Sequence, residues 1–239
     1  MAEPLILYIE TATDICSVAI SKGDQQLALE ESGPERSHAR LLNGFIRKAL
    51  EECGMEMTML DAVAVSRGPG SYTGLRIGVS TAKGIAYALE IPLLSCSTAE
   101  NMVLSSLVHP EVSALIRKLD QELLLCPMLD ARRMEVYAAF FTPDLGPVRG
   151  ISADIVDKES YRDLLADHHI CFFGNGAGKC RDVVRDPRAH FVEGIHPSAG
   201  SMIKPVLRDF RNRQFEDVAY FEPFYLKDFI ATKPRKKVL

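Results

Sequence analysis

Short apolar runs flank a polar turn near the start of the chain. Residues 4–9 read PLILYI and residues 15–21 read ICSVAIS, with ETATD between them, and QQLALEES at 25–32 continues the pattern. Apolar runs joined by a short polar turn predict a strand, a tight turn and a returning strand. The chain is therefore expected to open with an antiparallel hairpin or meander.

A helical pattern follows, after which helices alternate with buried strands. From 37 to 53 apolar residues recur at helical spacing, and Gly54 is placed to end the helix. The pattern then predicts a buried strand at 61–66, a helix at 75–89 and a short strand at 93–97. Ser97 and Glu100 have the spacing of a capping box that opens a helix through about residue 107.

The second half repeats the order of the first. QELLLCPMLDARRMEVYAAFFT at 121–142 again reads as an apolar run, an acid, a polar turn and an apolar run. A short helix near 160–167, a strand at 170–174 and a helix from 198 to about 214 are expected to follow. The repetition predicts two related α/β lobes, at 1–105 and 106–225, with a basic tail at 226–239.

Composition places the chain among globular proteins. It has 239 residues, 47% hydrophobic and 25% charged, with a net charge of −4 and a pI near 5.9. No window approaches the roughly 20 apolar residues of a membrane span, and the first residues lack a signal-peptide pattern. The six cysteines are scattered without a C-x-x-C pair, which predicts reduced core thiols and a cytoplasmic protein.

The stretch SRGPGSYTGLRIG at 66–78 joins a predicted strand to a predicted helix. It matches neither the G-x-x-x-x-G-K-[ST] phosphate loop nor the G-x-G-x-x-G dinucleotide pattern. Its glycines and proline permit close backbone approach, and Ser71 or Thr73 is placed to cap the helix. Two interpretations stay open: a structural loop, or one in which Gly70 and Ser71 contact a nucleotide or acyl phosphate.

Two rows of small residues run along the helix predicted at 75–89. The first row is Gly74, Gly78, Ala82 and Ala86, and the second is Ser80, Gly84 and Ala88. Glycine inside a helix costs up to about 1 kcal/mol relative to alanine, so each row indicates close contact with another backbone. One row is expected to serve the core and the other a partner. The alternative, that both rows are internal, stays open.

Two acids stand at the predicted hairpin turns, one in each lobe. Glu10 is followed by Thr11, and Asp130 occupies the corresponding place in the second lobe. In a two-lobed nucleotide clamp such acids face the cleft and order a metal-bound water, and the alternative is that they only cap N–H groups of the turns. The later loop GNGAGKC, with Gly174 and Gly176, is either an adenosine-contacting loop or a glycine-rich turn.

Histidine spacing gives no sign of a metal site. The six histidines include no H-x-x-x-H pair, and His168 and His169 are expected at a solvated helix end. No G-x-S-x-G nucleophile elbow is present either. Neither zinc chemistry nor serine-hydrolase chemistry is therefore predicted.

Several segments, in order along nearly the whole chain, resemble the bacterial TsaB (YeaZ) family. They are LYIETATDICSVAI, ERSHARLL, SRGPGSYTGLRIGVSTAKGIAYALEIPLLSCST, MLDARRMEVYAAF and FEPFYLK. The resemblance implies a two-lobed actin-like (ASKHA, ribonuclease-H-like) α/β fold with mixed sheets flanked by helices. It also implies a non-catalytic subunit of the machinery that forms N6-threonylcarbamoyladenosine in tRNAs reading ANN codons. The catalytic paralogue TsaD binds metal through an H-x-x-x-H pair, which this chain lacks.

The resemblance also implies partners. Association with TsaD is expected through the helices at 37–53 and 75–89, with a small ATPase, TsaE, in a ternary complex. A homodimer is expected when TsaD is absent, and tRNA contact only through the complex. No intrinsic cofactor or metal is expected, although ATP or ADP at the partner interface is a candidate. The residues expected at the TsaD contact are Leu41, Phe45, Gly74, Gly78, Ala82 and Ala86.

One departure from the family pattern concerns the first acid. The family usually has Asp where this chain has Glu10, which changes any metal-ordering geometry and disfavours ATP hydrolysis. An autonomous ATPase of the same fold stays the alternative function, and a peptidase has little support.

Overall fold

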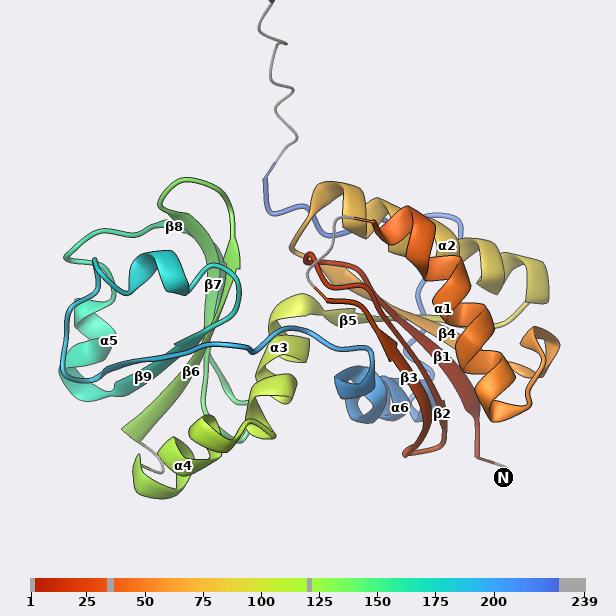
Figure 1. Ribbon diagram of the computed structural model, residues 1–239, viewed down its shortest axis with the longest axis horizontal. Helices are drawn as coiled ribbons and strands as arrows, with labels where there is room; N and C mark the ends of the chain where they lie inside the picture. Colours follow the sequence, from red (N-terminus) through yellow and green to blue (C-terminus); the bar gives the residue numbers. More distant parts are fainter. Residues whose placement is uncertain (1–2, 34–36, 120–121, 228–239) are drawn as a thin grey trace, which may run out of the picture.

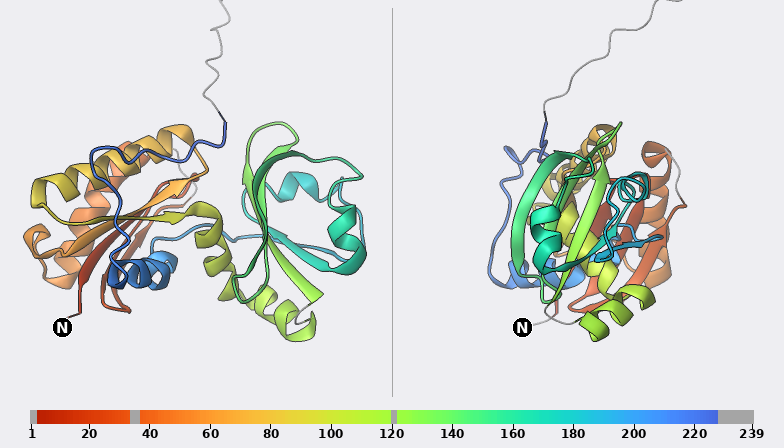
Figure 2. Two further views of the ribbon diagram at one scale, coloured as in Figure 1. Left: turned by 180° about the vertical axis from the view of Figure 1, so that it is seen from behind. Right: turned by 90° about the vertical axis from the view of Figure 1, so that its left-hand side faces the viewer.

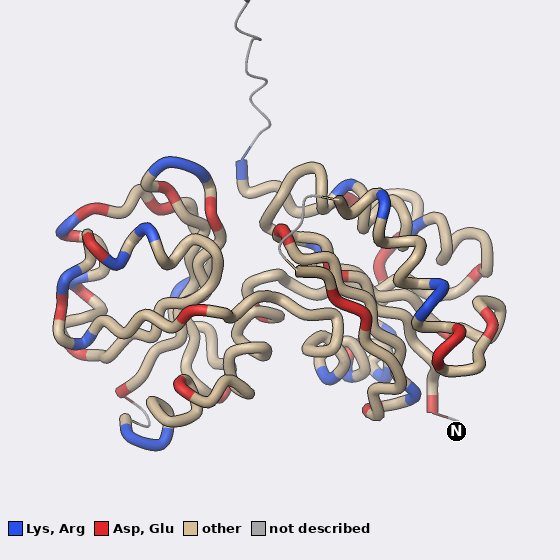
Figure 3. The backbone as a smooth tube through the Cα atoms, in the orientation of Figure 1, with Lys and Arg blue, Asp and Glu red and all other residues tan. Residues whose placement is uncertain are grey.

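The computed structural model describes residues 3–33, 37–119 and 122–227, and it contains two lobes, each built on one five-stranded mixed sheet (Figures 1 and 2). The predicted basic tail lies outside the described residues from position 228 onward. Figure 3 shows basic and acidic residues interleaved over both lobes, in keeping with the small net charge of −4.

The first sheet has the strand order β3-β2-β1-β4-β5. The first three strands are antiparallel, whereas β4 and β5 run parallel to β1, so that Tyr8 of β1 lies opposite both Ala19 and Ala64. The strands are β1 (Leu5–Glu10), β2 (Ser17–Lys22), β3 (Gln25–Glu31), β4 (Ala62–Gly68) and β5 (Leu93–Ser97), and the helices between them are α1 (His38–Cys53) and α2 (Tyr72–Leu89).

The second sheet repeats this connectivity. Its order β8-β7-β6-β9-β10 has the same sequence of antiparallel and parallel pairings as the first sheet. Its elements are β6 (Leu123–Asp130), β7 (Glu135–Phe141), β8 (Pro147–Ile155), α5 (Arg162–Asp167), β9 (His169–Phe173) and β10 (Ala189–Val192). The predicted two-lobed actin-like α/β fold and its duplicated hairpin start are confirmed.

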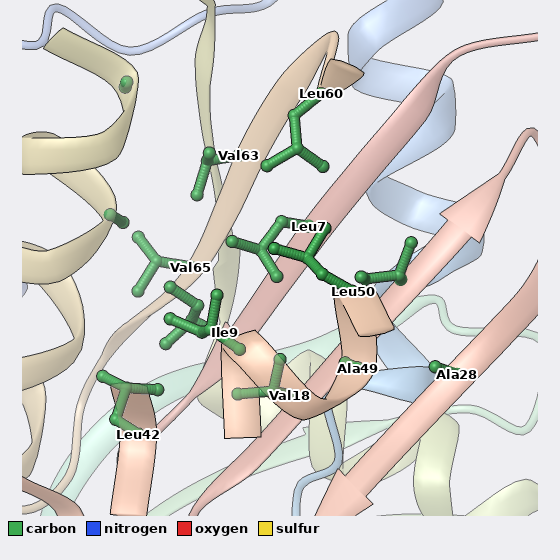
Figure 4. Close-up of a cluster of buried hydrophobic side chains, with 14 of the residues drawn as sticks. Leu7, Ile9, Val18, Ala28, Leu42, Ala49, Leu50, Leu60, Val63 and Val65 are labelled. Carbon is green, nitrogen blue, oxygen red and sulfur yellow. The ribbon is translucent and has the colours of Figure 1, made fainter. Parts of the chain in front are cut away.

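The alternation of side chains along β1 explains why it lies at the centre of the first sheet. Leu7 and Ile9 point to one face and pack with residues of α1 and α2, as Figure 4 shows for part of this cluster. Ile6 and Tyr8 point to the opposite face, in a second cluster. Because both faces are covered, the strand is apolar from Leu5 to Ile9, as expected for a central strand of a mixed sheet that is buried on both sides.

The second face of the first sheet is covered by the end of the chain. A 3-10 turn (Gly200–Met202) and α6 (Ile203–Arg211) place Met202, Ile203 and Val206 against Ile6 and Tyr8. The segment 214–227, called here the C-terminal strap, then runs along α2, where Lys83 Nζ donates to Phe221 O at 2.8 Å. The prediction that 106–225 forms the second lobe therefore needs correction, because residues from about 199 onward complete the first lobe.

Two helices join the lobes. They are α3 (Thr98–Leu107) and α4 (Pro110–Leu119), and the second of them was not predicted from the sequence. The capping box expected at Ser97 is absent, since the Ser97 side chain makes no cap hydrogen bond. Instead the hydroxyl of Thr98 lies 2.9 Å from that of Ser66 at the end of β4, which ties α3 to the first sheet.

Candidate functional site

The glycine-rich loop places the first turns of α2 directly on the β1–β2 turn. A Cβ atom added at Gly70 would lie 2.2 Å from Ala12 O, and one added at Gly74 would lie 2.1 Å from Thr11 O. At Gly78 it would lie 2.2 Å from Thr11 Oγ1. Real Cβ contacts are not this short, so these three positions admit only glycine at this helix-to-turn distance.

Hydrogen bonds to the same turn occupy the N-terminus of α2. Ser71 N donates to Ala12 O at 2.6 Å, and the Ser71 hydroxyl accepts from Gly74 N at 3.2 Å as the predicted N-cap. Thr11 Oγ1 donates to Gly74 O at 2.9 Å. These contacts favour the structural interpretation of the loop, because the Ser71 N–H that a phosphate would use already donates to the protein's own Ala12 carbonyl, and the Gly70 Cα lies close against the same carbonyl.

The first row of small residues is internal, which corrects the predicted TsaD contact. Gly74, Gly78, Ala82 and Ala86 are all buried, and the two alanines belong to the core cluster under α1 and α2. None of these four side chains or Cα positions offers a surface to another protein.

The second row faces outward instead. Ser80, Gly84 and Ala88 are exposed, and a Cβ added at Gly84 would meet nothing within 4 Å. Beside this row, Ile77 and Ile85 of α2 and the predicted residues Leu41 and Phe45 of α1 are partly buried and pack against the core. We call the surface made by these seven residues the α1/α2 face. It combines a bare stretch of helix backbone with partly exposed apolar side chains.

The first cleft acid is sealed inside the first lobe. Glu10 is fully buried and accepts from Ala12 N at 2.7 Å and from Asn101 Nδ2 at 2.6 Å, so that α3 covers it. Burial raises the pKa of Glu10 from 4.5 to about 7, against these hydrogen bonds, which lower it. Its oxygens are therefore engaged by the protein at the place where a nucleotide clamp would present a carboxylate.

The second cleft acid is held within its own lobe. Asp130 Oδ1 pairs with Lys179 Nζ, which also donates to Glu135 O at 2.7 Å. Asp130 N donates to the side chain of Asn175 at 2.9 Å. With Glu10 sealed and Asp130 paired, neither acid fits the role of ordering a cation beside a nucleotide. The residues present therefore do not fit the magnesium-bound ATP that the fold family implies.

A cleft lies between the lobes, but it is not lined by the predicted residues. Its volume is about 490 Å³, and its walls are the β1–β2 turn, the end of β3, the loop at 174–178 and residues 191–197. Of the predicted nucleotide contacts, only Gly174 lines it, whereas Glu10, Thr11, Gly70, Ser71, Asp130 and Gly176 do not. A Cβ at Gly176 would lie 3.0 Å from Leu129 O, which supports the interpretation of this loop as a tight turn.

Cysteines and histidines make no assembled metal site in the described chain. All six cysteines are free thiols, and five of them are buried. No group of three or more His, Cys, Asp or Glu side chains among the described residues is placed to hold a metal ion. His169 lies in β9 and its ring stacks on that of His190 in β10, so the helix end predicted for it is wrong.

Comparison with known proteins identifies the family. A family model described as "TsaD: tRNA N6-adenosine threonylcarbamoyltransferase" matches residues 32–160, more than half of the chain. A protein of Escherichia coli K12 named tRNA threonylcarbamoyladenosine biosynthesis protein TsaB is 29% identical over 95% of this chain and 96% of its own length. The chain belongs to the TsaB (YeaZ) branch of this family.

Two further relatives are similar over most of the chain. The Bacillus subtilis TsaB is 27% identical over 76% of this chain and 75% of its own length. An uncharacterized Mycobacterium tuberculosis protein is 31% identical over 80% of this chain and 84% of its own.

Two solved Pseudomonas aeruginosa structures share the TsaB fold found here. One, described as similar to peptidase YEAZ, has a TM-score of 0.79, 22% identity and coverage of 94% of this chain and 100% of that one. The other, named YeaZ, has a TM-score of 0.74, 24% identity and coverage of 93% and 100%. At these identities the structures establish the fold alone. In the described part of the chain, no helix is long and apolar enough to cross a bilayer.

Proposed function

We propose that this TsaB-family chain is a non-catalytic subunit of the machinery that forms N6-threonylcarbamoyladenosine in tRNA, and that it binds the catalytic protein TsaD. The observation that carries the proposal is the match, over nearly the full length of both chains, to relatives named for threonylcarbamoyladenosine biosynthesis. TsaE in a ternary complex, a homodimer of the isolated chain, and tRNA contact through the complex stay predictions.

We place the TsaD contact on the α1/α2 face. Two helices with an exposed small-residue row permit a partner helix to approach the backbone closely, and flanking apolar side chains supply area to bury. Ser80, Gly84 and Ala88 form such a row, with Ile77 and Ile85 beside it. Glycine at an exposed helix position costs up to about 1 kcal/mol, and Gly84 has no internal contact that explains it.

The absence of chemistry in this subunit is part of the proposal, and it rests on the engagement of the two cleft acids. Glu10 accepts a hydrogen bond from Asn101, and Asp130 forms an ion pair with Lys179. An autonomous ATPase would need at least one of them to face a cation. ATP or ADP shared with the partner, at the interface rather than in the cleft, stays a prediction.

Gly84→Leu tests the TsaD contact without disturbing the fold. Leucine is a better helix former than glycine, and its Cβ would meet nothing within 4 Å at this exposed position, so the isolated variant is expected to melt at or above the wild-type temperature. The same side chain holds a partner helix away, so binding to TsaD, measured by isothermal titration, is expected to weaken at least tenfold.

Gly150→Leu is the matched control, since a Cβ at this β8 position also meets nothing within 4 Å. Equal TsaD affinity for wild type and Gly84→Leu would place the contact elsewhere. Gly78→Leu would be the first choice from the sequence alone. It cannot distinguish a lost TsaD contact from a disturbed fold, because the new side chain would clash with Thr11 inside the lobe.

A further inference from the structure

The cleft between the lobes has the volume of a small-molecule site. At about 490 Å³ it falls within the roughly 300–1,000 Å³ range of ligand pockets. Buried apolar side chains, Ile15 from the first lobe and Ala177 and Ile195 from the second, form much of its wall. A ligand here would touch both lobes at once.

Arg181 presents a fixed flat surface in this cleft. Its Nη2 lies 2.9 Å from Glu193 Oε1 and 3.3 Å from Phe191 O, and its guanidinium stands 5.8 Å from the centroid of the Phe191 ring. The Phe191 ring in turn stacks on Phe172, with 5.0 Å between the ring centroids. The Arg181 side chain is still 48% exposed, so a ligand in the cleft can reach a guanidinium that these three contacts hold in place, and a planar ring can stack on such a group.

The charges of the described cleft wall do not suit a phosphorylated ligand. Glu193 neutralises the positive charge of Arg181, and Asp14 adds a carboxylate, whereas the described wall offers only His196 as a further basic side chain, with no lysine and no second arginine. A triphosphate would bring several negative charges toward Asp14 and Glu193, with no lysine or free arginine among the described lining residues to receive them.

Polar groups on the cleft wall can form hydrogen bonds with the edge of an uncharged ring. Asn175 Oδ1 accepts from Asp130 N, which fixes the side chain and leaves its Nδ2 as a donor. The Ser32 hydroxyl, which accepts from Cys16 N at 3.0 Å, adds a second donor from the first lobe. Both residues line the cleft.

We propose that this cleft binds an uncharged planar heteroaromatic molecule of the nucleoside or nucleobase class, stacked on Arg181, and that it excludes nucleoside triphosphates. The proposal goes beyond the partner-binding function and does not depend on it. A nucleotide-binding cleft between two lobes ordinarily binds both the base and the phosphates, whereas this cleft is proposed to bind the base and to exclude the phosphates.

Isothermal titration of the purified full chain with adenosine, and separately with ATP and magnesium, tests this assignment. Adenosine is expected to bind at least tenfold more tightly than ATP. Arg181→Ala is expected to weaken adenosine binding at least tenfold. Arg162→Ala, which removes an ion-paired arginine outside the cleft (65% exposed, against 48% for Arg181), is expected to leave adenosine binding unchanged. Glu193→Gln removes the carboxylate that neutralises Arg181, so it is expected to reduce the difference in affinity between adenosine and ATP.

Three results would overturn the proposal: no saturable adenosine signal, ATP binding as tight as adenosine binding, or Arg181→Ala without effect. The comparison of adenosine with ATP uses the wild-type chain, so it decides the question even where a variant fails to fold. TsaD binding is measured separately, so failure of this proposal leaves the proposed function standing and the reverse also holds.

Discussion

Two glycines of α2 ten residues apart are expected to respond in opposite ways to the same substitution. At Gly84 an added methyl group meets nothing within 4 Å, so Gly84→Ala gains only helix propensity, up to about 1 kcal/mol. At Gly74 the methyl group would lie 2.1 Å from Thr11 O, a backbone atom that cannot rotate away. The clash can be removed only if α2 moves away from the β1–β2 turn.

The cost at Gly74 has two sources. Overpacking of a core contact typically costs about 1–3 kcal/mol. The hydrogen bond from Thr11 Oγ1 to Gly74 O, 2.9 Å long, would weaken as the helix moves, at about 1 kcal/mol. After the gain in helix propensity is subtracted, Gly74→Ala is expected to destabilise the protein by about 2 kcal/mol.

Thermal melts of the wild type and both variants, followed by circular dichroism, measure this contrast. In a chain of this size 1 kcal/mol shifts the Tm by roughly 2–4 °C. Gly84→Ala should therefore melt a few degrees above the wild type, and Gly74→Ala roughly 4–8 °C below it. A Gly74→Ala protein that melts at or above the wild-type temperature would show that the loop does not hold α2 against the turn.

Three further predictions concern the first lobe. The pKa of Glu10 is about 7 in the folded protein, against a reference value of 4.5 for the unfolded chain. The stability that the protonated side chain contributes is therefore fully present below pH 4.5 and is lost as the pH rises through 7. The loss in the free energy of unfolding is about 3 kcal/mol. Urea unfolding at pH 5 and pH 8 should show this loss in the wild type and not in Glu10→Gln, and equal losses in both would contradict the burial argument. Ser71→Ala removes the N-cap of α2 and should lower the free energy of unfolding by about 1 kcal/mol in the same assay, whereas no change would mean the cap bond contributes nothing. Val206→Asp places a carboxylate on the buried side of α6 and should release the helix from the first sheet, seen as faster proteolysis after residue 198; unchanged proteolysis would argue against the packing of α6 on this lobe.

The duplicated fold could be predicted because its signals are local. Each lobe opens with apolar runs around a short turn, and β1 and the residues of β6 before Asp130 are buried, so both halves carry the same visible pattern. α4 was missed although Pro110 stands at its first position and Glu111, Arg117 and Lys118 follow the charge preference of a helix. Val112, Leu115, Ile116 and Leu119 also recur at helical spacing and pack in one cluster, so both the end signals and the apolar pattern of this helix were present in the sequence.

The positions of the two small-residue rows could not be told apart from the sequence. Both rows have the same spacing on one helix, and what separates them is the turn at Thr11 and Ala12, some sixty residues earlier in the chain. The return of α6 to the first lobe was hidden for a similar reason. An amphipathic helix shows which of its sides is buried but not which sheet covers that side.

The interlobe site was hidden by its composition. Arg181, Phe191 and Glu193 belong to no motif, and they meet because the 3-10 turn that ends before Arg181 lies against the end of β10 in the fold. The predicted contacts were chosen for glycines and acids at turns, and the structure uses most of those residues to close turns and seal the sheet edge.

Reconstitution of threonylcarbamoyl transfer tests the central claim most directly. Purified chain, TsaD and TsaE would be combined with unmodified tRNA, ATP and threonylcarbamoyl donor, and the modified nucleoside measured after digestion. The account predicts modification in the complete mixture, little when this chain is omitted or replaced by Gly84→Leu, and none from this chain with tRNA and donor alone. Modification by the isolated chain, or full activity of the mixture without it, would contradict the claim that it is a partner without chemistry of its own.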